Sequence, residues 1–593
     1  MATFTSLPQE IIDLILPAVP KEDYFSCVFV NRGWCAVFAP CFWRDVRMVA
    51  ESGNSQLISI EARKALVRNG HHVRVLETTD PSVVFTLATS QPPITSLEAL
   101  TIRLQDPVAP IAKTVHSDNV FIPVAQSTGK EKELDDFRRC SSSVLEILRN
   151  NPGLRFLSLD EGYFRYKDGK EGFLDLSQTF PTAHLEKLEL SFRRDPSSHA
   201  YSLDHDDYQG EIFDAAKEAH SRPVQTPFLA LTEIAITTEK TLPMDPRRLM
   251  FFLRCPNLER IRLARLDDMT MKAIAILLST SCPKVTCLEW TNPHYDVEDN
   301  IVQLIQSTLL GWKELRLPDM PEFGPDGFHA LMTHRNTLEV LKVESAERLD
   351  HNAAVDLLCA AQKLRRLEGP ADGQRTKFTQ ELTVFAYDTY LDHVQGMADR
   401  RWVLGPSMEF LQLRIEGVPR PDVLYRQSGG ELAFLLPALD PALRFVVQGW
   451  IYLQLNRMVN LQELILGETD FSQRRLDHLN VDASLDSIAL EEALLDHEVR
   501  AFNYQSMEFS LESGLMLLGG LKELRVLDVR RTAHRIGIAE LEWMYTNWPK
   551  LKEIRGLVTE RRWADRAEDG ARVKEEVEAW IAAHPKGIGS SFT

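Results

Sequence analysis

The sequence has few cysteines and no long apolar run. Its 593 residues include eight cysteines, none in a C-x-x-C pair, and most lie among apolar residues. This pattern predicts free, buried thiols in a reducing compartment. No uninterrupted stretch approaches the ~18 apolar residues of a membrane span, and the N-terminus lacks the basic-then-apolar layout of a secretory signal. We therefore expect a protein of the cytoplasm, the nucleus or both.

The common catalytic and cofactor signatures are also missing. The sequence has no H-E-x-x-H, no G-x-S-x-G and no G-x-G-x-x-G, and Gly129-Lys130 lacks the flanking residues of a phosphate loop. Asp204–Asp207 could hold a metal ion, but in a segment rich in Ser and Tyr it is more typical of a solvated acidic loop. We expect no catalytic residue, no metal site and no cofactor.

The composition is that of a folded soluble protein. Hydrophobic residues make up 44% of the chain and charged residues 26%, with a formal net charge of −18. This negative charge disfavours general binding to nucleic acid or to an anionic membrane.

One apolar pattern repeats at an even period. Six segments carry an apolar residue followed by others three and five positions on, at steps of 27, 27, 27, 26 and 26 residues. They begin at Leu231, Leu258, Val285, Trp312, Leu338 and Leu364. A unit this small cannot bury its own apolar face, so the period predicts a solenoid of stacked units.

Each unit contains two kinds of periodicity. The alternation in Ile261-Arg262-Leu263 is that of a strand with one buried face, whereas Ile301, Leu304 and Ile305 recur at helical spacing. Each repeat is therefore predicted to be a short strand plus a helix, which gives an α/β fold.

The segments Cys255-Pro256-Asn257-Leu258 and Cys282-Pro283-Lys284-Val285 resemble the start of the cysteine-containing leucine-rich repeat of about 26 residues. This subtype is common in F-box proteins. The resemblance implies strands on the concave face of the solenoid and helices on the convex face.

The N-terminal residues form a second informative stretch. Ser6 and Gln9 have capping-box spacing, and Asp23–Val30 and Arg32–Phe38 are short amphipathic segments. About forty residues form a small core, so this many large apolar side chains suggest a module that docks on another molecule.

This stretch resembles an F-box. The matching residues are Leu7-Pro8-Gln9-Glu10-Ile11-Ile12, Ile15-Leu16, Asp23-Tyr24, Val28-Phe29-Val30-Asn31-Arg32-Gly33-Trp34 and Phe42-Trp43-Arg44-Asp45-Val46, with Tyr24 and Gly33 as departures. The resemblance implies binding to the Skp-type adaptor of a cullin-based ubiquitin ligase. By position, the candidates for that contact are Leu7, Pro8, Ile11, Ile15, Val30 and Trp34. The alternative is that some of these large side chains, especially Trp34 and Trp43, only fill the interior.

The repeats and the resemblance predict a three-helix F-box followed by a leucine-rich-repeat solenoid. The expected parts are an F-box at 1–47, a helical linker with a first degenerate repeat at 48–93, the solenoid at 94–560, and a capping helix with a tail at 561–593. Insertions are expected at about 105–143, 193–227 and 370–407.

The solvent face of the sheet is the predicted target-binding surface. If Leu258, Ile261 and Leu263 point inward, strand alternation directs Arg260 and Arg262 outward. The same offset also turns Glu289, Glu314 and Glu368 outward, so the stripe is only mildly positive. Its basic members are the target-binding candidates, Arg260, Arg262, Arg316, Lys342, Arg366 and Arg414. This basic stripe favours a partner with an acidic or phosphorylated segment. The alternative is a solvated sheet of mixed charge.

Together these features predict the substrate-recognition subunit of an SCF-type ubiquitin ligase, in which the F-box binds adaptor and cullin and the repeats bind a target protein. One alternative is a leucine-rich-repeat scaffold outside ubiquitin ligation. Another is an enzyme with an unrecognised site in the insertions.

Overall fold

A computed structural model describes much of the chain. The described residues are 11–12, 15–48, 60–91, 93–103, 142–160, 180, 183–192, 226–238, 249–264, 268–291, 298–319, 323–345, 352–368, 401–403, 405–413, 446–466, 507–530, 532, 534–557 and 567–584. The chain divides into two compact units. The first is Met1–Val285 with Ser307–Leu310, and the second is Thr286–Gln306 with Gly311–Thr593.

The first unit contains seven of the described strands, which pair in parallel and in chain order. They are β1 (Asp45–Met48), β2 (Val75–Thr78), β3 (Ala99–Ile102), β4 (Phe156–Asp160), β5 (Lys187–Phe192), β6 (Glu233–Thr238) and β7 (Arg260–Ala264). Its described helices include η2 (Leu16–Ala18), α2 (Lys21–Val28), α3 (Arg32–Arg44), α4 (Ile60–Asn69), η3 (Gly70–His72), α5 (Pro81–Ala88), η5 (Met250–Arg254) and α10 (Asp268–Ser281), and residues 142–150 are also helical.

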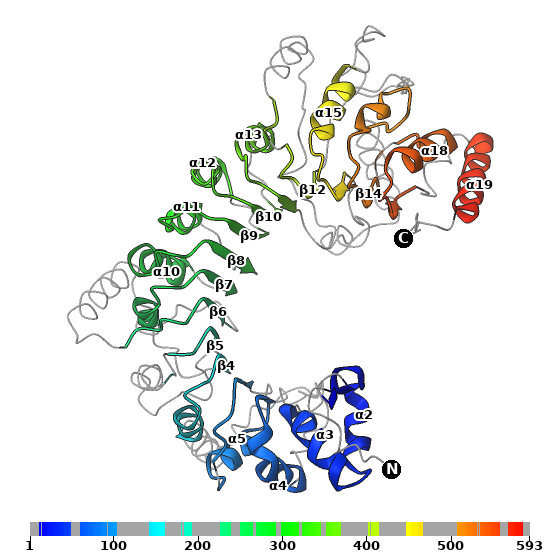
Figure 1. The fold of residues 1–593 in the computed structure, drawn as a ribbon. Coiled ribbons are helices and arrows are strands. Elements are labelled where there is room, and N and C mark those ends of the chain that lie inside the picture. Colours follow the sequence, from blue (N-terminus) through cyan, green and yellow to red (C-terminus); the bar gives the residue numbers. More distant parts are fainter. Residues whose placement is uncertain are drawn as a thin grey trace, which may run out of the picture. The chain divides into compact units, whose positions relative to one another are not determined.

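The second unit contains eight described strands, again in parallel and in chain order. They are β8 (Cys287–Thr291), β9 (Glu314–Asp319), β10 (Val340–Ser345), β11 (Arg366–Glu368), β12 (Phe410–Gln412), β13 (Glu463–Ile465), β14 (Val526–Asp528) and β15 (Glu553–Arg555). Its described helices are α11 (Glu298–Gln306), α12 (Pro325–Met332), α13 (Asn352–Ala360), α15 (Val446–Asn456), η9 (Leu515–Leu518), α18 (Ile538–Asn547) and α19 (Ala567–Ala583). In Figure 1, helices α11 to α13 lie on one side of strands β8 to β10.

The apolar repeat forms a ladder across both sets of strands. In the second unit Leu315 pairs with Leu341 and Leu341 with Leu367, and all three side chains are completely buried. The apolar residues that begin the six repeat segments are also buried. Burying one leucine stabilises the fold by roughly 1.5–3 kcal/mol, so stacking supplies the core that one repeat lacks. The predicted α/β architecture of strand–helix repeats is confirmed.

The repeats begin earlier in the chain than the sequence predicted. Strand β1 follows α3 without an intervening residue, and Val46, the last residue of the F-box match, pairs with Leu76 of β2. The region 48–93, expected to be a linker with one degenerate repeat, contains the end of β1, helices α4 and α5, and strand β2. The helices and the strand of this region have the character expected of a helical linker with one repeat, and what the sequence did not predict is strand β1, which directly follows α3.

Each strand is extended backwards by one further backbone hydrogen bond. In the second unit the N–H of Glu339 donates to the carbonyl oxygen of Lys313 at 2.7 Å, and the N–H of Arg365 donates to that of Glu339 at 2.7 Å. We call the residues that directly precede the strands the lead-in row. From β9 to β15 they are Lys313, Glu339, Arg365, Glu409, Gln462, Arg525 and Lys552.

The C-terminal helix was predicted and is present as α19. The Trp580 ring meets the Tyr545 ring of α18 edge-on, with 6.1 Å between centroids, and Val577 is buried. Most of the three expected insertions lies outside the described residues, namely 105–141, 193–225 and 370–400.

Candidate functional site

The N-terminal helices begin with clear local signals. The side chain of Asn31 caps α3 by accepting a hydrogen bond from the backbone N–H of Trp34 at 3.0 Å. Helix α3 then runs through Pro40 to Arg44, beyond the expected segment that ended at Phe38. In α2 the first turn carries Glu22 and Asp23, which suit the positive end of the helix dipole.

Aromatic side chains hold α2 against α3. The Tyr24 ring lies 5.7 Å from that of Phe38, which is buried, and the Trp34 ring stacks on Phe38 at 5.4 Å. The Tyr24 hydroxyl donates to the backbone oxygen of Leu16 at 2.8 Å, and burial raises the pKa of this hydroxyl. Tyr24, a departure from the F-box pattern, therefore has a structural role.

The outer side of α2 exposes apolar side chains. No residue of α2 is buried. Phe25 is 56% exposed, Phe29 72% and Val30 58%, and the Phe25 and Phe29 rings lie 4.8 Å apart. We call Phe25, Phe29 and Val30 the N-terminal apolar patch. Adjacent exposed apolar residues of this size are typical of a protein interaction site.

The predicted adaptor-binding residues are found in different environments. Leu7 and Pro8 lie outside the described residues. Ile11 and Val30 are exposed, whereas Ile15 and Trp34 are half-buried. The Trp34 ring stacks on that of Phe38, so one of its faces is covered inside the module.

Sequence reasoning missed Phe25 and Phe29. Their spacing of four places them on one face of α2, next to Val30. This spacing is visible in the sequence and could have identified the pair.

The sheet face carries the predicted target-binding residues. Arg260 and Arg262 alternate with buried Ile261 and Leu263, as expected from the strand pattern. Arg316, Lys342 and Arg366 are likewise half-buried and outward. The remaining candidate, Arg414, lies outside the described residues.

Three of these cations contact carboxylates of the same face. Arg316 donates to Glu314 at 2.6 Å and to Glu368 at 3.3 Å, and Arg366 donates to Glu368 at 2.8 Å. Arg262 lies 3.1 Å from Glu233. Burial lowers the pKa of Arg316, but the hydrogen bond with Glu314 and the charge of Glu368 raise it, and the net pKa lies above its ordinary value. These arginines are therefore neutralised locally, which weakens the preference for an acidic partner on this face.

Aromatic rings add to the same face. The guanidinium of Arg366 lies 4.6 Å from the centre of the Phe410 ring, and Lys187 lies 5.3 Å from that of Phe156. Lys187 also pairs with Glu189 at 2.9 Å and with Glu233 at 3.1 Å. The face has the mixed charge that the alternative expectation described.

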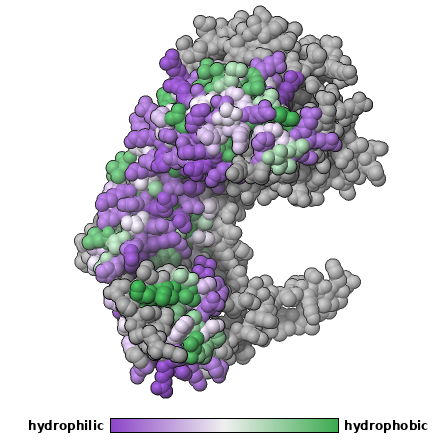
Figure 2. Space-filling view, turned by 45° about the vertical axis from the view of Figure 1, so that its right-hand side comes forward, coloured by the Kyte–Doolittle hydropathy of each residue, from purple (hydrophilic) through white to green (hydrophobic). Residues whose placement is uncertain are grey.

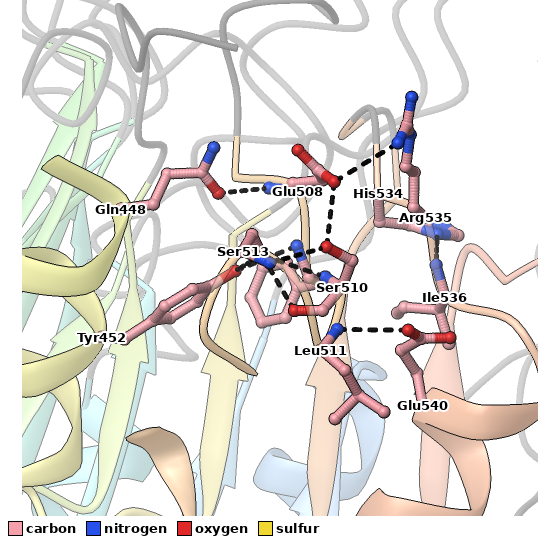
Figure 3. A network of polar contacts seen from close by, with 11 residues as sticks. Gln448, Tyr452, Glu508, Ser510, Leu511, Ser513, His534, Arg535, Ile536 and Glu540 are labelled. Atoms are coloured by element: carbon pink, nitrogen blue, oxygen red, sulfur yellow. Dashed lines mark hydrogen bonds and ion pairs between the residues drawn. The ribbon is translucent and has the colours of Figure 1, made fainter. Parts of the chain in front are cut away.

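A buried polar network lies beside α15 and α18 (Figure 3). Glu508 is 1% exposed and its carboxylate accepts from the Ser510 hydroxyl at 2.9 Å, with Arg535 3.7 Å away. Phe509 has a φ of 52°, the left-handed region that bulky residues rarely adopt.

Side chains satisfy the backbone of this irregular segment. The N–H of Glu508 donates to Gln448, that of Phe509 to the Tyr452 hydroxyl, and that of Leu511 to Glu540, at 3.0–3.1 Å. Buried backbone donors need such partners where no helix or strand supplies them. The network therefore holds the segment before η9 in place, and its serine hydroxyls are occupied in doing so.

The described residues were compared with the requirements of a metal site and of a reactive thiol. Among the described residues no group of three or more His, Cys, Asp or Glu side chains is arranged to hold a metal ion. Cys255 and Cys282 are buried, and burial raises the pKa of Cys282 to about 12, so this thiol is not a ready nucleophile. Asp204–Asp207 lies outside the described residues.

The chain was compared with protein-family models and with curated proteins. No protein-family model matches the chain, and no curated protein shows significant similarity to it. Within the part of the chain that the structure describes, no helix is long and apolar enough to cross a membrane.

Proposed function

We propose that this chain is the substrate-recognition subunit of an SCF-type ubiquitin ligase. In this proposal the N-terminal helices bind a Skp-type adaptor, which connects them to the cullin scaffold, and the strand–helix repeats, as leucine-rich repeats, bind a target protein. The observation that carries the proposal is the N-terminal apolar patch. It runs from Phe25 of α2, a helix without a buried residue, to the two residues that follow this helix, within the stretch that resembles an F-box.

The N-terminal apolar patch keeps apolar area in contact with water. Phe25, Phe29 and Val30 each leave more than half of their surface in water, although the Phe25 ring also lies 5.8 Å from that of Phe42. That exposed apolar area gains nothing from the fold. A partner that covers them recovers about 25 cal/mol for each Å² of apolar area removed from water. Aromatic anchors of this kind dominate the energy of many protein interfaces.

The contribution of the chain to ubiquitin transfer would be proximity. Holding a target near the charged carrier enzyme raises the effective concentration of target lysines. The direct connection from α3 to β1 suits this role, since Lys21 of α2 also pairs with Asp45 of β1 at 3.2 Å.

The proposal is tested by co-purification of adaptor and cullin with the tagged chain. We expect the wild-type chain to retain both, and the double variant Phe25→Ser/Phe29→Ser to lose them. The matched control is Phe85→Ser, because Phe85 is a 46% exposed phenylalanine on α5 of the same unit. Failure of the wild-type chain to retain adaptor, or equal loss in the control, would overturn the proposal and favour a scaffold outside ubiquitin ligation.

A further inference from the structure

Two runs of four residues in the lead-in row alternate in charge. In the second unit the run is Lys313, Glu339, Arg365 and Glu409, each joined to the next by a backbone hydrogen bond of 2.7–2.8 Å. In the first unit Arg74, Glu98, Arg155 and Glu186 follow the same order. Residues on adjacent strands lie about 4.8 Å apart, so each cation in these runs has an acidic neighbour within reach.

Ion pairs form along these alternating runs. Arg365 lies 2.6 Å from Glu409, Arg155 lies 2.7 Å from Glu186, and Arg74 lies 3.7 Å from Glu98. The alternation therefore neutralises the row locally.

The last two strands depart from this alternation, as do the first two, where Arg44 precedes Arg74. After Gln462 come Arg525 and Lys552, two cations in succession, and the N–H of Lys552 donates to the carbonyl oxygen of Arg525 at 2.8 Å. Both side chains are exposed. In the described part of the chain, neither side chain makes an ion pair or a hydrogen bond. Two like charges on neighbouring strands repel each other, which is unfavourable in the isolated molecule.

The adjacent turns add two more cations. Lys522 is exposed and donates to the backbone oxygen of Asn547 at 2.8 Å, which leaves its charge unbalanced. Lys550 is exposed and pairs with Glu523 at 2.5 Å. We call Lys522, Arg525, Lys550 and Lys552 the C-terminal basic edge. It contrasts with the net charge of −18 of the whole chain.

We propose that the C-terminal basic edge binds an acidic, carboxylate-rich segment of a partner protein. A short extended peptide can place carboxylates against Arg525 and Lys552, and the arginine can bind one of them through two parallel hydrogen bonds. A long polyanion such as nucleic acid is disfavoured, because it would also meet the acidic remainder of the surface. This edge would be where the chain recognises its target protein, so the inference rests on the proposed function.

The test uses the full chain and a fluorescent polyglutamate peptide, with binding measured by anisotropy at low ionic strength. We expect the wild-type chain to bind the peptide, and its affinity to fall as salt is added. The affinity of Arg525→Ser/Lys552→Ser should be about fivefold to thirtyfold lower, because each substitution removes one surface ion pair with the peptide. The control is Lys313→Ser, an exposed lead-in lysine with a glutamate on the next strand. We expect this control to bind as the wild type does.

Three results would overturn the inference: no binding of the peptide to the wild-type chain, an equal loss in Lys313→Ser, or tighter binding of duplex DNA than of polyglutamate at the same salt. The adaptor takes no part in this experiment. Failure here therefore leaves the proposed function standing, and failure of adaptor binding leaves peptide binding unaffected.

Discussion

Helix α2 and the strands use apolar side chains in opposite ways. The ladder residues Leu315, Leu341 and Leu367 are completely buried, whereas α2 buries no residue, and Phe25 of this helix and Phe29 at its end are exposed. The ladder repeats because each strand needs its neighbours to exclude water. The patch does not repeat, and its apolar area remains available. Burial therefore separates residues that build the fold from residues available for a partner.

The largest effect on stability is expected when a buried leucine of the ladder is truncated. Leu341 lies on the central strand of three and is completely buried, so Leu341→Ala should lower the free energy of unfolding by about 2–5 kcal/mol. Urea unfolding followed by circular dichroism measures the change. Phe29→Ser should change it by no more than about 0.5 kcal/mol, because the ring is already in water. Equal losses in the two variants would contradict the division.

A smaller effect is expected where one repeat caps the next. The carboxylate of Glu298 in α11 accepts from the backbone N–H of Gly324 at 3.0 Å and of Gly327 at 2.9 Å, at the start of α12. Glu298→Ala should cost about 1–2 kcal/mol in the same unfolding measurement. Asp299→Ala is the matched control, since Asp299 is exposed in the same first turn. A control as damaging as Glu298→Ala would remove the capping explanation.

The buried His334 predicts that the free energy of unfolding depends on pH, with an effect no larger than that of Glu298→Ala. Its Nε2 lies 2.8 Å from the backbone oxygen of Ile305, and burial lowers its pKa although this hydrogen bond acts in the opposite direction. The folded state thus takes up a proton less readily than the unfolded state, whose histidine pKa is about 6.5. The stability from neutral His334 is present above that pH and is lost as the pH falls below it.

Unfolding at several pH values between neutral and mildly acidic tests this. We expect the wild type to lose more stability over that range than His334→Gln does. Parallel curves for the two proteins would show that His334 does not contribute.

The smallest effect is expected on the sheet face. Arg316 and Glu368 are 3.3 Å apart and partly exposed, so a double-mutant cycle with Arg316→Ala and Glu368→Ala should give a coupling of about 0.5–1 kcal/mol. The coupling should fall as salt is added. A coupling well above this range would indicate that the face is more tightly organised than its exposure suggests.

The sequence predicted the strands well, because their apolar residues follow one spacing. Leu231, Leu258 and Val285 mark strands that the structure contains, and the residues between the buried positions face outward as alternation requires. Strand β1 was missed because its single buried residue, Val46, had been assigned to the end of the F-box match.

The candidate sites were harder to predict, since they depend on contacts between separate elements. Strand alternation placed Arg316 and Arg366 outward, but it could not show that Glu368 binds both. In the same way, the helical pattern of 23–30 did not distinguish the inward Tyr24 from the outward Phe25 and Phe29. Their roles became clear only from the packing of α2 on α3.

The most direct test of the central claim is calorimetric titration of purified Skp-type adaptor into the purified chain. We predict saturable binding to the wild-type chain with a negative heat-capacity change, the signature of apolar burial. We also predict its loss in Phe25→Ser/Phe29→Ser, while the unfolding free energy falls by less than it does in Leu341→Ala because only part of each ring is buried. Absence of binding to the wild-type chain, or undiminished binding by the double variant, would contradict the assignment of the N-terminal apolar patch as the adaptor interface.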